Sequence, residues 1–552
     1  MIKKILLFLS VTLALFTPLM AFTASSYPVT FKDVYITDPI DGVQISARVY
    51  YPEVKSPVLF PAIVMPNSWD MNKFEYIVQA KDFAEEGYVA LTYSARGWGS
   101  STGKVDGGGP NDMADIKAIL DWLPKNTPTD ASRVGMAGIS YGGGLSLLAA
   151  AHFPTQVKVV AAMSGWADLY DSLDGNGSPA RVWGELLLQT GKVLGHLPEE
   201  IQQNYDNITE HRNMAETIAW AKERSPDLAE NLATLNQYQT PIYLSNNFED
   251  RLFKPNYLLT FFNQLKTNDK YMDLNQGIHA TAELSGLVDI AGADKSNYVW
   301  NHVHGWFDHY LKGVNNEFVG QPKINMQVRQ SKQYIHINPV NSNDIQETHY
   351  YLLPRHLESK IIKDSAYHRY GSLQSVAPNE ILATNQINAD KITGISSGVP
   401  ILSSLLQPFV STPAYFPLVS TNGAITYISA PVTEDKLIAG TAEVTAWVKP
   451  SSEKMQLIAY LYDECTTGLC KGWGTLISHG PVTLYHAATS QAQKVVIPLR
   501  SAAYELAKGH ALALAFATHD LLYTPPASEN YTIEFNYPAV EPAELVVPYY
   551  QG

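Results

Sequence analysis

The chain has 552 residues, about three to four times a typical domain length of roughly 150, so it can form more than one unit with its own core. Hydrophobic residues make up 45% and charged residues 17% of the sequence, which excludes a disordered or collagen-like protein. The 53 acidic residues exceed the 39 basic ones, and no basic stripe compensates for this balance. Such a surface repels phosphate backbones, so we expect no nucleic-acid partner.

The first residues have the pattern of an export signal. Lys3 and Lys4 precede an apolar run over residues 5–21, which ends near the small residues Ala21 and Ala24. The run is shorter than the roughly 20 residues that span a bilayer comfortably. We therefore predict a cleaved signal peptide over residues 1–24, with an uncleaved N-terminal anchor as the alternative. The mature protein is expected to be periplasmic or secreted, with no membrane span.

Residues 29–313 alternate short β-branched runs with helical patterns, which is typical of a doubly wound α/β sheet. Strands are predicted at 43–51, 60–65, 89–93, 134–139, 157–163, 241–245 and 270–274. Residues 111–123 repeat apolar side chains on one helical face. Between the strands at 157–163 and 241–245 the pattern is helical only, and it predicts a cap over the carboxyl ends of the strands.

Beyond Gly313 the pattern changes to consecutive short strands. Residues 441–448 alternate apolar and polar side chains, and further strands are predicted at 455–462, 494–499 and 510–518. Strands without intervening helices predict a β-sandwich of the jelly-roll type. We therefore expect an α/β domain over residues 25–318, with a helical cap at 166–240, and a β-domain over 319–552.

The only two cysteines, Cys465 and Cys470, lie close together in a turn-like segment with no histidine beside them. Two sulfur atoms alone do not make a zinc site, so we expect no metal here. In an exported protein this spacing predicts a local disulfide, with two free thiols as the alternative.

The segment Gly138-Ile139-Ser140-Tyr141-Gly142 lies between a predicted strand and an apolar helix. This is the context of a nucleophile elbow, in which glycines two residues before and after the serine permit a tight strand-to-helix turn. The turn exposes the hydroxyl group above the sheet and places a helix N-terminus beside it. Ser140 is therefore the predicted nucleophile.

A serine hydroxyl is a weak nucleophile until a histidine takes its proton and a carboxylate orients that histidine. In this arrangement of strands the acid follows the serine along the chain, and the histidine comes last. Two carboxylates follow the strand at 241–245; we predict Asp250 as the acid, with Glu249 as the alternative. His279 follows the next strand and is the predicted base.

With these residues, the chain resembles the Xaa-Pro dipeptidyl-peptidase-like family of α/β-hydrolases, which includes acyl hydrolases of the cocaine-esterase type. The resemblance rests on the segments 93–103, 138–143, 306–313, 438–448 and 460–463. It implies an α/β-hydrolase domain with a helical cap and a C-terminal jelly roll packed on it. It also implies a catalytic triad of Ser140, Asp250 and His279, and no cofactor.

The loop after the strand at 60–65 departs from the family pattern. It reads Pro66-Asn67-Ser68-Trp69-Asp70 and lacks the tyrosine that provides a phenolic donor in esterase-like members. We predict the oxyanion hole from the backbone N–H of Tyr141 together with that of Ser68 or Trp69. For Trp69, a role as a wall of the pocket is the alternative.

These residues predict an exported serine hydrolase that cleaves an ester or an amide of a small molecule or a short peptide. A dipeptidyl-peptidase needs an anchor for the free amine of its substrate. Candidates in the cap are Asp168, Asp171, Asp174 and Glu185, with a solvated helix face as the alternative. An acyl esterase of small molecules, which needs no such anchor, is the alternative. A non-catalytic surface protein that binds glycan is a hypothesis from a different class. The sequence leaves a homo-oligomer open.

Overall fold

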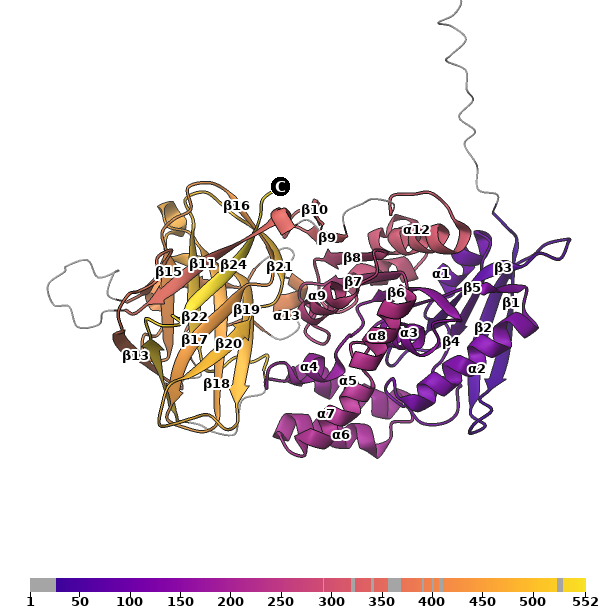
Figure 1. Cartoon of the computed structure of the whole chain (residues 1–552), viewed down its shortest axis with the longest axis horizontal. Helices are drawn as coiled ribbons and strands as arrows, with labels where there is room; N and C mark the ends of the chain where they lie inside the picture. Colours follow the sequence, from indigo (N-terminus) through magenta and orange to yellow (C-terminus); the bar gives the residue numbers. More distant parts are fainter. Residues whose placement is uncertain are drawn as a thin grey trace, which may run out of the picture.

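The computed structural model describes residues 26–290, 292–318, 323–338, 342–355, 369–389, 392–399, 402–406, 411–523 and 530–552. The predicted signal peptide lies outside these ranges. An α/β unit and a β-rich unit follow each other along the chain and lie side by side (Figure 1). Within the described residues, no helix is both long and apolar enough to cross a membrane.

The α/β unit is built on a ten-stranded sheet with the order β1-β2-β4-β3-β5-β6-β7-β8-β9-β10. Neighbouring strands from β4 to β9 run parallel, whereas β1, β2 and β10 pair antiparallel at the two edges. This confirms the predicted doubly wound sheet. The strands are β1 Val29–Thr37, β2 Gln44–Pro52, β3 Phe60–Pro66, β4 Val89–Tyr93, β5 Thr129–Ile139, β6 Val157–Met163, β7 Ile242–Asn247, β8 Lys270–Asn275, β9 Ile324–Gln327 and β10 Tyr334–Ile337.

Helices cover both faces of this sheet. The apolar residues of α2 (Pro110–Asn126), α3 (Tyr141–His152) and α9 (Pro255–Gln264) belong to one core cluster. Those of α1 (Ile77–Glu85) and α12 (Tyr298–Lys312) belong to another. Alternate residues of β3 point to opposite faces, so Val64 lies in the first cluster and Met65 in the second. Burial on both faces explains why the central strands are almost wholly apolar.

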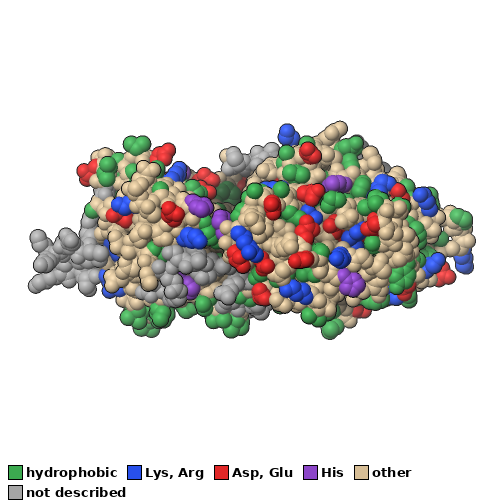
Figure 2. Space-filling view, turned by 90° about the horizontal axis from the view of Figure 1, so that it is seen from below, with side chains coloured by type: hydrophobic (Ala, Val, Ile, Leu, Met, Phe, Trp, Pro, Cys, Tyr) green, Lys and Arg blue, Asp and Glu red, His purple; other side chains and the backbone are tan. Residues whose placement is uncertain are grey.

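The cap is a group of helices between β6 and β7: α4 Leu169–Asp174, α5 Arg181–Leu194, α6 Glu199–Glu210, α7 Met214–Glu223 and α8 Ala229–Tyr238. In Figure 1, α4 to α7 lie together along the lower edge of the α/β unit. Helix α8 returns the chain to the sheet and packs on α3. Acidic and basic side chains are interspersed over the face that Figure 2 shows.

The α/β unit extends beyond residue 318, where the sequence analysis placed its end. Strand β9 pairs in parallel with β8, with Ile324 opposite Met272, and β10 pairs with β9. No helical pattern separates these short strands from those that follow, so the sequence analysis grouped them with the β-domain. Their hydrogen bonds move the boundary to a point after Ile337.

The β-rich unit holds a fourteen-stranded, mostly antiparallel sheet whose strands enclose their own apolar core. On β17 the alternating residues Val444, Ala446 and Val448 are buried in that core, as the pattern predicted. The elements are β11 Ile345–Leu353, β12 Gly371–Gln374, β13 Leu382–Asn388, α13 Leu402–Leu406, β14 Pro413–Tyr415, β15 Ala424–Ser429, β16 Lys436–Gly440, β17 Glu443–Pro450, β18 Met455–Glu464, β19 Trp473–Leu484, β20 Gln493–Pro498, β21 Ala502–Leu506, β22 Ala511–Ala517, β23 Thr532–Tyr537 and β24 Glu544–Tyr550.

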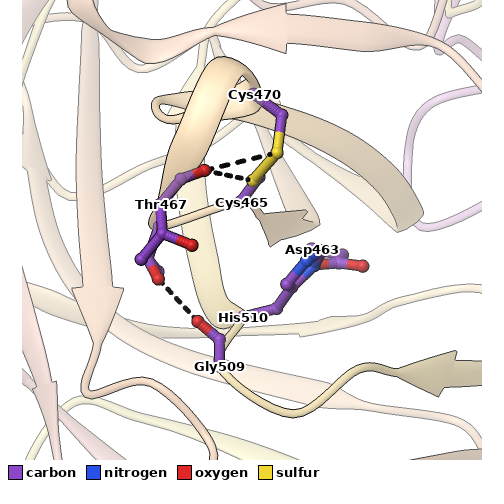
Figure 3. Close-up of a disulfide and its surroundings, with 7 residues drawn as sticks. Asp463, Cys465, Thr467, Cys470, Gly509 and His510 are labelled. Carbon is purple, nitrogen blue, oxygen red and sulfur yellow. Dashed lines mark hydrogen bonds and ion pairs between the residues drawn. A yellow bond between two sulfur atoms is a disulfide. The ribbon is translucent and has the colours of Figure 1, made fainter.

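Cys465 and Cys470 form a disulfide in the connection between β18 and β19 (Figure 3), which confirms the predicted pairing. Both sulfur atoms lie near the carbonyl oxygen of Thr467, at 3.2 and 3.5 Å. The hydroxyl group of Thr466 donates a hydrogen bond to the carbonyl oxygen of Gly509 at 2.5 Å. The bridge thus closes a short loop between two antiparallel strands, far from the elbow along the chain.

Candidate active site

The predicted nucleophile lies at a sharp turn between β5 and α3. Ser140 has φ 56° and ψ −117°, a conformation that non-glycine residues rarely adopt. A Cβ atom on Gly138 would lie 2.5 Å from the carbonyl carbon of Gly142, and one on Gly142 would lie 2.2 Å from the carbonyl oxygen of Pro66. Both glycines are therefore needed for backbone to approach backbone, which explains the spacing in the sequence.

The structure brings Ser140, His279 and Asp250 together. Nε2 of His279 lies 2.8 Å from Oγ of Ser140, and Nδ1 lies 2.7 Å from Oδ2 of Asp250. Asp250 follows β7, and His279 follows β8. Because β5, β7 and β8 are parallel, their carboxyl ends meet at one edge of the sheet. The three side chains form one hydrogen-bonded line.

Asp250 is completely buried and is held by its own loop. Its second oxygen, Oδ1, accepts hydrogen bonds from the backbone N–H groups of Leu252 and Phe253 at 2.9 and 3.0 Å. Glu249, the alternative acid, points elsewhere and forms an ion pair with Arg500 at 2.8 Å. It also lies 3.7 Å from Arg329. The carboxylate that faces the histidine is thus that of Asp250.

The pKa of His279 reflects two opposing effects. Burial lowers it, because the imidazolium form loses water, whereas the negative charge of Asp250 and its hydrogen bond raise it. The net result is a pKa above the usual 6.5. The ring is enclosed by Trp183 of the cap and by Phe253, whose ring centroids lie 5.8 and 5.5 Å away.

The loop after β3 leaves one of the two predicted backbone donors available. The N–H of Ser68 already donates to Oε2 of Glu75 at 2.7 Å, which corrects the Ser68 alternative for the oxyanion hole. The N–H of Trp69 donates to no other residue in the described part of the chain. Its indole Nε1 donates to the carbonyl oxygen of Leu187 in α5 at 3.0 Å, and Trp69 lines the cavity, as the alternative role predicted.

Glu75 was not identified in the sequence analysis, yet it links this loop to the elbow. Oγ of Ser68 lies 2.6 Å from Oε1 of Glu75 and 3.0 Å from the carbonyl oxygen of Ile139, the residue before the nucleophile. The N–H of Ile139 donates to the phenol of Tyr76 at 2.9 Å. No local pattern marks this glutamate, because its partners are brought to it by the fold.

The number of hydrogen atoms available to the Glu75, Ser68 and Ile139 network favours a protonated Glu75. Ser68 has one hydroxyl hydrogen but two acceptors within reach. If Glu75 carries a proton on Oε1, it donates to Ser68, and the Ser68 hydrogen is free for Ile139. Burial raises the pKa of Glu75 to about 7, against the hydrogen bonds from Ser68 that lower it. The neutral acid is therefore accessible near neutral pH.

The other predicted oxyanion donor, Tyr141, begins helix α3, so its N–H has no partner in the preceding helical turn. Its phenol is turned away from the serine and donates to Asp112. Burial and the nearby charge of Asp106 raise the pKa of Asp112 to about 7. The side chain of Tyr141 therefore anchors the elbow, and its backbone N–H remains the predicted oxyanion donor.

A cavity of about 150 Å³ lies beside Ser140, between the elbow and the cap. Its lining is predominantly apolar and includes Trp69, Trp166, Leu188, Ile208, Trp220 and Phe253. The charged residue of the lining is Arg251, which directly follows Asp250. Such a cavity suits an apolar group of a small molecule.

The cap carboxylates that were candidates for an amine anchor are placed elsewhere. Asp168 caps α4 by accepting the N–H of Asp171 at 2.9 Å and forms an ion pair with Lys222. Asp174 accepts the N–H of Gly177 at 2.7 Å. Glu185 accepts a hydrogen bond from the phenol of Tyr205 at 3.0 Å. Among the described residues that line the cavity beside Ser140, none of the four candidates occurs.

Two family models match this chain. Residues 41–281 match the model of X-Pro dipeptidyl-peptidase (S15 family), which includes the elbow, the cap and all three residues of the hydrogen-bonded line. Residues 349–544 match the model of the X-Pro dipeptidyl-peptidase C-terminal non-catalytic domain. The two matches correspond to the α/β unit and the β-rich unit.

Individual proteins agree with these models. A "Putative Xaa-Pro dipeptidyl-peptidase" of Bacillus anthracis is 22% identical over 278 residues, or 46% of this chain and 43% of that protein. The cocaine esterase of Rhodococcus sp. (strain MB1 Bresler) is 30% identical over 138 residues, or 24% of this chain and 23% of the esterase. The chain thus matches less than half the length of these curated relatives.

The fold is shared over almost the whole chain with solved structures. An aminopeptidase from the marine sediment archaeon Thaumarchaeota archaeon superposes with a TM-score of 0.69 at 14% identity, covering 95% of this chain and 97% of the aminopeptidase. Its two units therefore have the same arrangement as those described above. From both family models and this fold, the chain belongs to the Xaa-Pro dipeptidyl-peptidase-like and cocaine-esterase-type family of α/β-hydrolases, a family of serine hydrolases.

Proposed function

We propose that this protein is a serine hydrolase that cleaves a carboxylic ester or amide through an acyl-enzyme on Ser140. The observation that carries the proposal is the line from Asp250 through His279 to Ser140, with hydrogen-bond distances of 2.7 and 2.8 Å. This geometry is that of a nucleophile, its base and the acid that orients the base. It also favours catalysis over the glycan-binding hypothesis, which has no use for an assembled triad.

The residues have distinct roles in the proposed reaction. Oγ of Ser140 attacks the substrate carbonyl carbon while Nε2 of His279 takes its proton, and Asp250 stabilises the imidazolium. The N–H groups of Tyr141 and Trp69 bind the oxyanion of the tetrahedral intermediate. His279 then returns the proton to the leaving group. Water repeats these steps on the acyl-enzyme and releases the acid.

Within this reaction class, the cavity supports an acyl esterase better than a dipeptidyl-peptidase. A dipeptidyl-peptidase must hold a charged α-amine close to Ser140, and a carboxylate is the usual partner for such a group. The cavity beside Ser140 is mainly apolar, none of the four cap carboxylates lines it, and Asp168, Asp174 and Glu185 have other partners. A small ester with an apolar acyl stem is therefore the proposed substrate, and the proposed site of action is the periplasm or the outside of the cell.

Intact mass after exposure to a fluorophosphonate probe tests the nucleophile. We expect one adduct on the wild type and none on Ser140→Ala or His279→Ala. Hydrolysis of short acyl esters should fall by at least about 10⁴-fold in either variant. An adduct that persists in Ser140→Ala, or a folded wild type without an adduct, would contradict the proposal.

Substrate preference is a separate measurement. We expect p-nitrophenyl butyrate to be hydrolysed with a higher kcat/KM than alanyl-prolyl p-nitroanilide. Because these two substrates also differ in their leaving groups, alanyl-prolyl p-nitrophenyl ester is compared with the butyrate, and its N-acetylated form shows the effect of the free amine. If blocking the amine sharply lowers kcat/KM, the protein is a dipeptidyl-peptidase and the esterase assignment is wrong.

A further inference from the structure

Arg251 is a buried cation at the wall of the catalytic cavity. Its relative exposure is 8%, and it lines the cavity together with Ser140 and Phe253. Its Nε and Nη1 atoms are buried without a hydrogen-bond partner in the described part of the chain. A guanidinium group cannot relieve this situation by losing its proton, because it stays charged at any ordinary pH.

Neighbouring acidic groups offset the burial of Arg251 only in part. After burial, the largest electrostatic effect on it comes from Arg500, which is another cation, while Glu249 and Asp520 act in the opposite sense. Glu249 lies nearby, but its oxygens are taken by Arg500 at 2.8 Å and approach Arg329 at 3.7 Å. Burial and the repulsion from Arg500 lower the pKa of Arg251 to about 10. The charge is thus held at a cost in folding free energy, as is common at functional sites.

A ligand with a carboxylate would supply the missing partner. A guanidinium group binds a carboxylate through two parallel N–H···O bonds, and this pairing is strongest when both groups are out of water. The rest of the cavity is lined by apolar and aromatic side chains that suit a short hydrocarbon chain. A cavity of about 150 Å³ is comparable to one that holds a benzene molecule.

We propose that Arg251 is a specificity residue that binds a carboxylate at the far end of the acyl group. The preferred substrates are then monoesters of short dicarboxylic acids. The carboxylate is assigned to the acyl side because the acyl group stays on Ser140 in the enclosed cavity, whereas the leaving group must depart. This inference rests on the proposed function and names its substrate class.

Matched ester pairs test the inference. Monomethyl succinate and monomethyl adipate are compared with methyl butanoate and methyl hexanoate, in which a methyl group replaces the carboxylate. The rate of acid release is followed at constant pH. We expect the wild type to prefer the charged member of a pair, and Arg251→Met to lose this preference by about 10- to 100-fold in kcat/KM. Arg251→Lys should retain part of it.

Controls separate recognition of the carboxylate from general effects. Lys222→Met removes a cation that is paired with Asp168 outside the cavity, so we expect its preference to match the wild type. The butanoate ester of 4-hydroxybenzoate places a carboxylate on the leaving group instead, and we expect Arg251→Met to leave its kcat/KM unchanged relative to phenyl butanoate. An effect confined to this ester would overturn the assignment to the acyl side.

Stability gives a second readout. Because Arg251 lacks a partner and is repelled by Arg500, we expect Arg251→Met to keep or raise the melting temperature. A fall of many degrees would show a structural role and overturn the inference. If wild type and Arg251→Met both hydrolyse the esters and show the same preference for the charged member of a pair, the inference about Arg251 is wrong but the proposed function stands. A wild type that hydrolyses no ester and forms no adduct on Ser140 overturns the proposed function as well.

Discussion

Burial and a few close partners determine the pKa values of His279 and Glu75, two titratable residues linked to the elbow. His279 is enclosed by rings, yet Asp250 raises its pKa above the usual value. Glu75 lies beside the Tyr76 phenol and bonds to the N–H and the hydroxyl oxygen of Ser68, and burial raises its pKa to about 7. A base and an acid, each with a raised pKa, are therefore linked to the same elbow.

The first prediction concerns the pH dependence of kcat/KM for a neutral ester. His279 must be neutral to accept the Ser140 proton, so activity should rise as pH passes its pKa. Because this pKa is raised, the midpoint of the rise in kcat/KM with pH should lie above 6.5. In a separate measurement, Asp250→Asn should lower kcat by about 10⁴-fold, since the charge that orients His279 is lost. A midpoint below 6.5 in the wild type would show that burial outweighs Asp250.

The second prediction concerns Glu75 as a positioning residue. Glu75→Gln can accept the Ser68 N–H through its carbonyl and donate to Ser68 Oγ through its amide, as the protonated acid does. We expect this variant to keep most of the activity, whereas Glu75→Leu should lose about 10²-fold in kcat with little change in KM. Equal loss in both variants would contradict the protonated state.

The same network predicts a decline of wild-type activity above pH of about 7, because Glu75 then ionises and Ser68 loses its donor. Glu75→Gln has no proton to lose at this position. We expect the wild-type profile to fall at high pH and that of Glu75→Gln to stay level. Paired pH–rate profiles measure this difference.

At the level of elements, the site depends on how closely the end of β3 approaches the start of α3. Gly142 is the contact point, since a Cβ atom there would lie 2.2 Å from the Pro66 carbonyl oxygen. The loop that bears Trp69 begins directly after Pro66. The close contact between Gly142 and Pro66 therefore also fixes the position of the loop that bears Trp69, the predicted oxyanion donor.

The third prediction follows from this contact. Gly142→Ala must push β3 and α3 apart, so we expect a loss of about 1–3 kcal/mol in the free energy of unfolding and a lower kcat. Gly313→Ala is the control, because Gly313 ends α12 with φ 72° and has open space around it. It should lose stability through backbone strain but keep kcat. A Gly142→Ala enzyme with normal kcat would show that the elbow tolerates displacement.

At the level of the whole molecule, the β-rich unit contacts the loop that carries Asp250. Glu249 precedes Asp250 and pairs with Arg500, which follows β20 of the other unit. Beside it, Nδ2 of Asn256 donates to the carbonyl oxygen of Leu499 at 2.8 Å, and Oδ1 of Asn256 accepts the N–H of Ser501 at 3.0 Å. The two units therefore share a buried polar interface next to the active site.

The fourth prediction uses this interface. Glu249→Gln keeps the shape of the side chain but leaves Arg500 without its charge partner, so we expect a loss of about 3–5 kcal/mol in the free energy of unfolding. Arg500→Met should cost a similar amount, and the double variant less than the sum. Urea unfolding of the four proteins gives the coupling energy. Additive effects would show that the pair does not join the two units.

Local sequence patterns are enough to predict the α/β sheet, the helical cap, the elbow and the chain order of Ser140, Asp250 and His279. Each of these depends on local patterns: apolar runs of strand length, helical periodicity, and two glycines around Ser140 that no other residue can replace. The disulfide was also predictable, because Cys465 and Cys470 are near neighbours in the chain.

Which of two adjacent carboxylates faces His279 depends on contacts that form only in the folded protein. Neighbouring loop residues point in different directions, and Glu249 is held away by Arg500, which lies about half the chain further on. The same holds for Glu75, whose partner Ser68 also contacts the Ile139 carbonyl at the end of β5, and for Arg251, whose lack of a partner appears only once the cavity is formed. The pairing of β9 and β10 with the first sheet, which the sequence analysis did not predict, likewise depends on contacts between distant segments. Contacts between distant segments carry no local signal, so the fold alone fixes them.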